Sequence, residues 1–387
     1  MKYSRNKINN AGDILLTSKD EAQTNYAISI IEDWRTLHLP VLDELHNSVV
    51  SILETKHISI LSVSQRLKRR FSIQQKLSIN PQMKLGGLQD IGGLRIVFPT
   101  MEVLNMAYEA LKNNLPDNFE LTKDPMNYIL HPKNSGYRSI HFIYKYKSEN
   151  PDLDGIRIEL QLRTKLQHSW AMAVETAGLF TKTDLKASQG NENWLTFFKM
   201  ISTLFALKEK TPILTEHLNN IYNKNDIILQ SYKLNRDHKF IDTLKALNIS
   251  IKHLQKEKHK NGYYILNIDY ERGKVVIMTF SKEEEKKATH KYSVLEKQIE
   301  GKNQAVVLVS VPKLQELHEA YPSYFLDTKN FIEIIEKEFV KKLGFLNEKT
   351  FRSFVAVIYP DSNSQYAKNE KEFFDLVEQY KNKGGKK

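Results

Sequence analysis

The hydrophobic pattern changes its period within the segment RIELQLRTKLQHSWAMAVET. Over residues 157–164 polar and apolar side chains alternate, which is typical of a β-strand with one buried face. After Thr164, a residue type that often caps a helix N-terminus, apolar residues such as Leu166 and Trp170 recur at helical spacing. The segment therefore predicts a strand followed by a helix over residues 165–180.

The polar face of this predicted strand carries Glu159, Gln161, Arg157 and Arg163. Charged groups on a strand that packs its other face into a core need polar partners, because burying them unpaired is costly. The pattern therefore predicts that this face forms the floor of a polar site.

Helices and strands alternate through the rest of the first half of the chain. This order predicts an α/β sheet flanked by helices. The expected elements are helices over residues 20–79 with a break near Pro40, a strand over 92–99, a helix over 101–113 and a strand over 139–146.

The second half has a different pattern. Residues 192–233 are helical in periodicity, residues 262–280 resemble a hairpin around Glu271, Arg272 and Gly273, and 304–312 should be a further strand. Two helical stretches flank the segment YPSY, and the tail KNKGGKK is expected to be disordered. No internal repeat is evident. We expect an α/β domain at 1–190, a helical connector at 191–235 and a smaller α+β domain at 236–387.

The composition is that of a globular protein. The 387 residues are 41% hydrophobic and 27% charged, and the net charge of +11 favours a polyanionic partner such as a nucleotide or nucleic acid. The absence of cysteine excludes disulfides and thiolate zinc sites. No apolar run approaches the roughly 20 residues that span a bilayer, and the polar N-terminus lacks a signal-peptide core. These features predict a cytoplasmic protein with no membrane partner.

A basic cluster precedes the first predicted strand. Such a cluster is often only a solvated helix face, but its position also suits phosphate binding. Its members are Arg66, Lys68, Arg69, Arg70 and Lys76.

The segment LQDIGGLRIVF places Asp90 just before the pair Gly92 and Gly93, at the mouth of the strand that carries Arg95. A glycine pair is usually plain turn chemistry, and the segment does not fit the phosphate loop that ends in GK[ST]. If Asp90 and Glu159 lie on neighbouring strands, two carboxylates converge among many cations. A magnesium nucleotide would explain this arrangement, since the carboxylates would hold the metal and the cations the phosphates.

A third polar group lies in the segment HPKNSGYRSIH. A tyrosine beside a flexible glycine can stack on a base, although it can also simply pack at a loop. The candidate residues are Lys133, Tyr137, Arg138 and His141.

The ordered set RLKRRFSIQQK, DIGGLR, GYRSIH and ELQLRT, spread over roughly residues 60–180, resembles the synthetase domain of the RelA/SpoT enzymes. These enzymes transfer pyrophosphate from ATP to the 3′-hydroxyl of a purine nucleotide. The resemblance implies a nucleotidyltransferase-like mixed sheet flanked by helices, with Mg²⁺ as cofactor and ATP as donor. It implies ATP contacts for Arg66, Lys68, Arg69, Lys76 and Arg95, metal or catalytic roles for Asp90, Glu159 and Gln161, and acceptor contacts for Lys133, Tyr137, Arg138, His141, Arg163 and His168.

The sequence departs from the long members of this family. No histidine is followed by aspartate, so the His-Asp dipeptide of their hydrolase domain is absent. The closing helix has Glu175 followed by Thr176, where alarmone synthetases usually have a Glu-His pair. This variation is similar to the toxic small synthetase branch, whose members modify the 3′ CCA end of tRNA or make adenosine alarmones.

A toxic synthetase without a hydrolase needs an inhibitor, and the second domain is the candidate. Tyr321 and Tyr324 flank Pro322, which could be no more than an aromatic corner between helices. The YxxY element also resembles the neutralising motif of fused toxin and antitoxin proteins of the CapRel type. There the tyrosines occupy the ATP adenine site, and a phage structural protein releases the block. In relatives this domain can be a zinc finger, but the lack of cysteine permits only a metal-free form.

Three hypotheses remain open at this point. The first is an autoinhibited pyrophosphokinase toxin that modifies tRNA in antiphage defence, with a phage protein as activator. The second is a small alarmone synthetase that makes guanosine tetraphosphate or related products from ATP and a purine nucleotide. The third is a catalytically silent RNA-binding or sensor protein.

Overall fold

The computed structural model describes residues 3–68, 70–114, 116–181, 192–218, 224–245, 263–269, 274–299, 302, 304–310 and 324–343. The chain divides into two compact units. The first comprises Met1–Lys133 and Tyr137–His168, and the second comprises Asn134–Gly136 and Ser169–Lys387. The predicted division at residues 190 and 235 stays a prediction.

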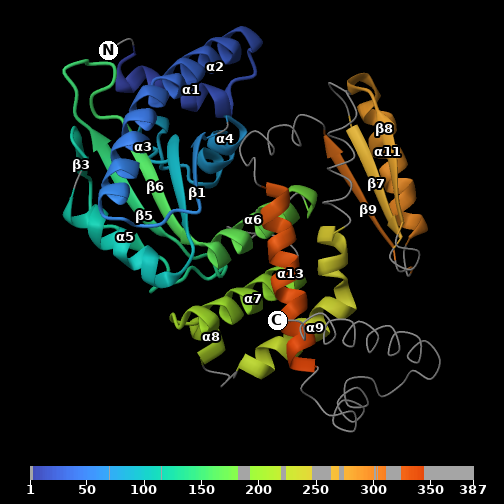
Figure 1. Ribbon diagram of the computed structural model, residues 1–387. Coiled ribbons are helices and arrows are strands. Elements are labelled where there is room, and N and C mark those ends of the chain that lie inside the picture. The colour runs from blue at the N-terminus through green and yellow to red at the C-terminus, as the bar shows by residue number, and fades with distance from the viewer. Residues whose placement is uncertain are drawn as a thin grey trace, which may run out of the picture. The chain divides into compact units, whose positions relative to one another are not determined.

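The first unit is built on a mixed sheet (Figure 1). The strand order is β1-β2-β6-β5-β3, and the short β4 also pairs with β5. Only β2 and β6 run parallel, while the other pairs are antiparallel. The strands are β1 (Ser62–Leu67), β2 (Gly92–Phe98), β3 (Phe119–Leu121), β4 (Met126–Asn127), β5 (Ile140–Tyr146) and β6 (Arg157–Thr164). The predicted mixed sheet flanked by helices is confirmed.

Two helices, α3 (His38–Thr55) and α5 (Met101–Asn113), pack on the apolar face of this sheet. Leu160 and Leu162 of β6 are fully buried in the same cluster, together with Leu104 of α5. Each such side chain contributes about 1.5–3 kcal/mol on burial, so this face fixes the sheet on its core.

A smaller cluster lies at the N-terminal helices, where Ala27, Ile31 and Ile73 are fully buried. Asp20 caps the second of these helices by accepting hydrogen bonds from two backbone N–H groups. The elements are α1 (Arg5–Thr17), α2 (Glu21–Thr36), α4 (Arg70–Ile79) and the short turn η1 (Leu85–Gly87).

The expectation of helix throughout residues 20–79 was wrong at β1. Residues 62–67 form an edge strand that pairs antiparallel with β2. Its serines and Arg66 alternate with Val63, Gln65 and Leu67. This pattern gives only a weak local preference for a strand, and pairing with β2 decides the conformation. The helix break falls at Leu37, and Pro40 lies in the first turn of α3, where a proline is tolerated.

The second unit contains a helical core and a small sheet. Phe198, Phe205 and Phe331 are buried in the helical core, and Thr176 on α6 lies 3.3 Å from Thr328 on α13. The helices are α6 (Lys165–Thr181), α7 (Glu192–Glu209), α8 (Thr215–Leu218), α9 (Lys224–His238) and α13 (Tyr324–Leu343).

The small sheet confirms the predicted α+β character of the C-terminal region. Its strand order is β8-β7-β9, all antiparallel, and α11 packs against it through Leu295. Its elements are β7 (Tyr263–Asp269), β8 (Lys274–Phe280), η3 (Lys282–Glu284), α11 (Glu285–Gln298) and β9 (Gln304–Ser310).

Within the described ranges, every helix is too short or too polar to cross a bilayer. Tyr321, Arg69, the turn around Glu271 and the C-terminal tail lie outside the described residues. Tyr324 is described only as the first residue of α13.

Candidate active site

The face of the first sheet that turns away from α3 and α5 is polar. Glu159 on β6 is opposite Gly93 on β2, and Gly93 is opposite Arg66 on β1. Two residues along β6, Gln161 is opposite both Arg95 and His141. Paired residues in a sheet project to the same side, so these polar side chains share one face. The polar side of β6 thus continues across four strands.

Gly93 separates Arg66 from Glu159. A Cβ atom at Gly93 would lie 3.7 Å from Cγ of Arg66, in ordinary contact, whereas larger side chains would fill the space above β2. The charge of Arg66 contributes to the lowered pKa of Glu159, so the guanidinium acts on the carboxylate across this gap.

Asp90 lies two residues before β2 and binds two lysines. Its Oδ2 accepts hydrogen bonds from Nζ of Lys68 at 2.8 Å and from Nζ of Lys76 at 2.9 Å. Lys68 follows β1 and Lys76 lies on α4. Burial raises the pKa of the Asp90 carboxyl, but the charges of the two lysines outweigh burial and lower it. Burial also lowers the pKa of Lys68.

The Glu159 carboxyl is strongly held in its ionised form. Burial raises its pKa, but the interactions with His141, Gln161 and Arg66 together outweigh burial. His141 acts through its charge and a contact of 3.4 Å between Nδ1 and Oε1. Gln161 adds a hydrogen bond from Nε2 to the same oxygen. The net effect is a pKa well below the ordinary range of a glutamate.

A hydrogen-bonded chain continues from Glu159 to Tyr137. The Tyr137 hydroxyl lies 2.8 Å from Nε2 of His141 and accepts a hydrogen bond from Nη2 of Arg163 at 2.7 Å. Arg163 is fully buried and also donates to Oε1 of Gln161 at 2.6 Å. Burial lowers the pKa of His141, but the oxygens of Tyr137 and Glu159 outweigh burial and raise it.

The ring of Tyr137 is covered by cations. Its side chain is only 7% exposed, with Nζ of Lys133 at 5.2 Å and the guanidinium of Arg163 at 5.1 Å from the ring centroid. A base could stack on this ring after one of these cations moves away.

The remaining predicted residues have the following places. Arg95 is buried in β2, and His168 is buried in the first turns of α6. Arg138 is buried and donates to the carbonyl oxygen of Ile129 at 3.2 Å, which supports the loop before β5.

Sequence reasoning missed Tyr128 and Ser202, and it named Gly136 only as the flexible neighbour of Tyr137. The Tyr128 ring lies 4.5 Å from Nζ of Lys133 and packs edge-on against His141. Gly136 has a φ of 88°, which favours glycine, and its carbonyl oxygen accepts a hydrogen bond from the buried hydroxyl of Ser202 on α7. The glycine in NSGYRS signals the turn, but no sequence pattern links it to a serine 66 residues later.

The two carboxylates fit a magnesium ion. Oδ1 of Asp90 is buried and accepts no hydrogen bond from the residues that the structure describes, and the charge of Glu159 acts on the Asp90 carboxyl. Mg²⁺ is usually held by one or two carboxylates together with waters and substrate phosphates. No group of three or more His, Cys, Asp or Glu side chains suited to a metal was found in the described ranges.

Comparison with known proteins covers the same part of the chain. Residues 65–182 match the family model described as "Region found in RelA / SpoT proteins". This range includes Arg66, Asp90, Tyr137 and Glu159.

Two relatives show the same likeness. A probable GTP diphosphokinase, RSH2, of Oryza sativa subsp. japonica is 34% identical over 116 residues, which are 30% of this chain and 15% of that protein. The GTP pyrophosphokinase YjbM of Bacillus subtilis is 31% identical over 121 residues, which are 30% of this chain and 56% of that protein. The chain thus spans about half, or much less, of the length of these relatives.

The crystal structure of small alarmone synthetase 1 from Bacillus subtilis is 22% identical and superposes with a TM-score of 0.39, covering 49% of this chain and 94% of that one. The segment that resembles the RelA/SpoT region, residues 65–182, is the segment that carries the polar face of the sheet.

Proposed function

We propose that the protein is an ATP-dependent pyrophosphokinase. The observation that carries this proposal is the position of two ionised carboxylates, Asp90 and Glu159, at the adjacent strands β2 and β6, beside Arg66, Lys68 and Lys76. A protein that only bound RNA would gain little from two acidic groups among these cations. The likeness of residues 65–182 to the RelA/SpoT region supports the same chemistry.

The reaction is a displacement at the β-phosphorus of ATP. The acceptor 3′-hydroxyl oxygen forms a bond to that phosphorus, and the bond to the bridging α,β-oxygen breaks. AMP leaves with the bridging oxygen, and the proton of the hydroxyl passes to solvent. Positioning and charge stabilisation dominate such reactions. Mg²⁺, when bound by Asp90 and Glu159, would neutralise charge on the phosphates.

Each cation has a role in this scheme. Arg66, Lys68 and Lys76 bind the phosphates, and Arg95 supports the nucleotide. Lys68 and Lys76 are bound to Asp90 in the free protein, and a triphosphate with its metal would take over both partners. Binding thus exchanges one set of ion pairs for another, which limits the desolvation cost.

Glu159 orients the acceptor hydroxyl in this scheme. A carboxylate with a strongly lowered pKa is a weak base at neutral pH, so it serves better as a metal ligand or hydrogen-bond acceptor. His141, whose pKa is raised, is bonded to both Glu159 and Tyr137 and fixes the position of the carboxylate.

The acceptor that we propose is the 3′ CCA end of tRNA. The net charge of +11 and the cations around Tyr137 favour a polyanion, although electrostatic contacts carry no sequence information. A free purine nucleotide is the second candidate, and it is favoured by the likeness to a probable GTP diphosphokinase and a GTP pyrophosphokinase. Incubation with γ-labelled ATP distinguishes the two, because the label passes to tRNA in the first case and to GDP, GTP or an adenine nucleotide in the second.

We propose further that the C-terminal region inhibits the enzyme until a phage protein binds. Tyr324 begins α13, four residues before Thr328, which contacts Thr176 on α6, the helix that follows the catalytic strand. The YxxY element is therefore only a few residues from Thr328, and Thr328 contacts α6, the helix that carries His168. The trigger must bind the open form in preference to the closed form to shift the equilibrium.

A further inference from the structure

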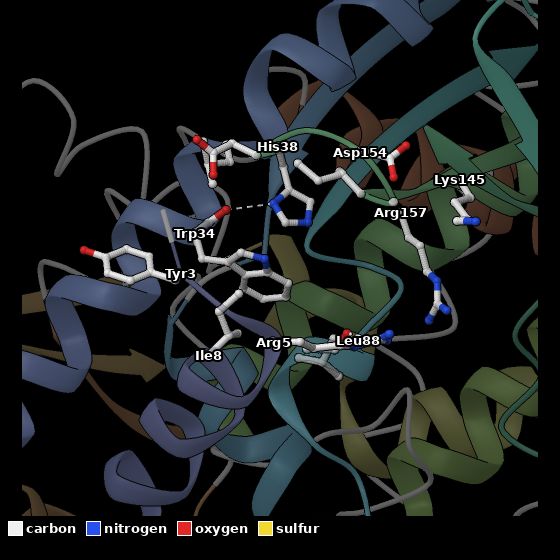
Figure 2. Close-up of a pocket in the computed structure, with 14 residues that line it drawn as sticks. Tyr3, Arg5, Ile8, Trp34, His38, Leu88, Lys145, Asp154 and Arg157 are labelled. Atoms are coloured by element: carbon white, nitrogen blue, oxygen red, sulfur yellow. Dashed lines mark hydrogen bonds between the residues drawn. The ribbon is translucent and has the colours of Figure 1, made fainter. Parts of the chain in front are cut away.

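The first unit has a pocket whose lining includes neither Glu159 nor Gln161. It has a volume of about 170 Å³ and is bordered by α1, the junction of α2 and α3, and the loop between β5 and β6 (Figure 2). Trp34, His38, Leu88 and Ile156 form its buried walls. An apolar cavity of about 150 Å³ accommodates a benzene ring, so the size suits one or two fused rings.

His38 presents a free hydrogen-bond acceptor to this pocket. Its side chain is 1% exposed, and its Nδ1 lies 2.9 Å from the carbonyl oxygen of Trp34, to which it must donate because a carbonyl only accepts. Burial lowers the pKa of His38 to about 4, so at neutral pH the other nitrogen, Nε2, carries a lone pair. Within the part of the chain that the structure describes, no group donates to Nε2.

The position of the ring is fixed. Trp34 and His38 pack edge to face with centroids 4.8 Å apart, and Figure 2 shows Nε2 on the side of the ring away from the Trp34 carbonyl. His38 Nε2 thus supplies one acceptor at a fixed position in the pocket lining. A ligand that enters the pocket with an N–H group would find its partner at this point.

Arg157 offers a free cation at the border of the same pocket. No hydrogen bond or ion pair of its guanidinium is found among the described residues. The other cations are engaged, since Nζ of Lys145 donates to Glu120 at 3.0 Å and Nη2 of Arg5 donates to the carbonyl oxygen of Gly86 at 3.1 Å. Figure 2 shows the Arg157 guanidinium directed away from the Asp154 carboxylate, toward the side where Arg5 lies.

The carboxylates of Asp152 and Asp154 border the pocket as well. Asp154 already accepts a hydrogen bond from the backbone N–H of Ser148 at 3.1 Å. Both would repel an anion on their side, so an acidic group is favoured only beside Arg157 and Arg5, whose planar guanidinium groups suit a carboxylate or phosphate.

We propose that this pocket binds a planar nitrogen heterocycle that carries one acidic group, with an N–H group of the heterocycle, in the ring or on an exocyclic amine, donated to His38 and the acidic group on Arg157. The ring would pack between Trp34 and Leu88. A nucleoside monophosphate and a heteroaromatic carboxylate share this chemistry. The proposal rests on the geometry of the pocket and does not depend on the proposed transfer reaction.

Calorimetric titration of the full chain tests the proposal with two probes, AMP and orotate. Adenosine, which lacks the anion, and inorganic phosphate, which lacks the ring, serve as ligand controls. Arg157→Gln should weaken binding at least about tenfold, the usual scale for losing one charge-assisted partner. Lys147→Gln is the matched control, because it removes the same charge from the loop between β5 and β6 without lining the pocket.

The outcomes are distinct. If AMP binds, orotate does not, and Arg157→Gln weakens AMP binding, the ligand carries a phosphate. If orotate binds and AMP does not, the ligand carries a carboxylate. Arg157→Lys keeps the positive charge but loses the planar guanidinium group, so it should bind with intermediate affinity. It also keeps the proposal testable if Arg157→Gln does not fold. Absence of binding by both probes, or equal affinity in wild type, Arg157→Gln and Lys147→Gln, would overturn the proposal.

Discussion

Arg66 and Glu159 lie on either side of Gly93, in one row across β1, β2 and β6. Because glycine has no side chain, the charge of the guanidinium acts on the carboxylate across an open strip of backbone. The proposed triphosphate and its metal would use this strip. Its neighbour Gly92 has another role, because a Cβ there would lie 2.5 Å from Cδ1 of Ile158 in the core.

The strip gives a first prediction. Gly93→Leu should reduce pyrophosphate transfer by about 10- to 100-fold, since a small misplacement of reacting groups costs that much. Gly93→Ala should retain most activity, because its Cβ would make only an ordinary contact at 3.7 Å. Steady-state rates and thermal unfolding of both variants check this. A Gly93→Leu protein with normal rates would mean that substrate does not pass over β2.

A second prediction concerns pH. The pKa of His141 is raised above its ordinary value of 6.5, so the stabilisation from its charge is complete below that pH and is lost as pH rises through the higher pKa of the folded state. The free energy of unfolding of wild type, relative to His141→Gln, should therefore fall as pH rises above 6.5. Urea titrations at several pH values measure this difference. His131→Gln, at an exposed histidine before Tyr137, is the control variant.

The loop before Tyr137 gives a third prediction. Gly136→Ala combines a strained φ with a Cβ that would lie 2.9 Å from Cβ of Ser202. We therefore expect it to lower the free energy of unfolding by about 1–3 kcal/mol more than a strained φ alone would. Gly155→Ala is the matched control, with a φ of 78° and no atom closer than 3.9 Å. Chemical denaturation compares the two. Equal losses of stability would show that α7 does not constrain this loop.

Because Gly136 is next to Tyr137, Ser202→Ala should also weaken acceptor binding. We expect its KM for the acceptor to rise more than its kcat falls, since the hydroxyl holds the loop and does not reach the reacting atoms. A purely structural role would instead lower activity in proportion to the folded fraction.

A fourth prediction tests inhibition by the C-terminal region. The double variant Tyr321→Ala with Tyr324→Ala should make expression of the full chain toxic, because the rings that we propose to block the ATP site are gone. Tyr321→Phe with Tyr324→Phe keeps the rings and should remain harmless. Growth after induction measures both. Harmless expression of the alanine variant with an intact enzyme would remove the proposed inhibitor.

Strand β6 was predictable because its signal is local. The alternation at residues 157–164 and the apolar spacing after Thr164 gave β6 and α6 nearly to the residue. The neighbouring strands β2 and β5 also followed from apolar runs bounded by turn residues. A period of two over eight residues leaves few alternatives.

Features that depend on distant partners could not be predicted. β1 is a strand because β2 lies beside it, although it precedes a helix and was expected to be helical. The pairing of Asp90 with Lys68 and Lys76 depends on the placement of α4, and the bond from Ser202 to Gly136 depends on how α7 packs. His38 gave no signal, since an isolated histidine in a helix is usually a core residue.

The fifth prediction addresses the central claim, that ionised carboxylates at β2 and β6 perform pyrophosphate transfer. Glu159→Gln and Asp90→Asn should each lower transfer of label from γ-labelled ATP by about 100-fold or more, the scale of one lost electrostatic group, while the protein stays folded. Glu120→Gln is the control, because this partly exposed glutamate on β3 pairs only with Lys145 and Lys147 among the described residues. The account predicts loss of labelled tRNA or nucleotide in the first two variants and normal product in the third. Wild-type rates in folded Glu159→Gln would contradict it.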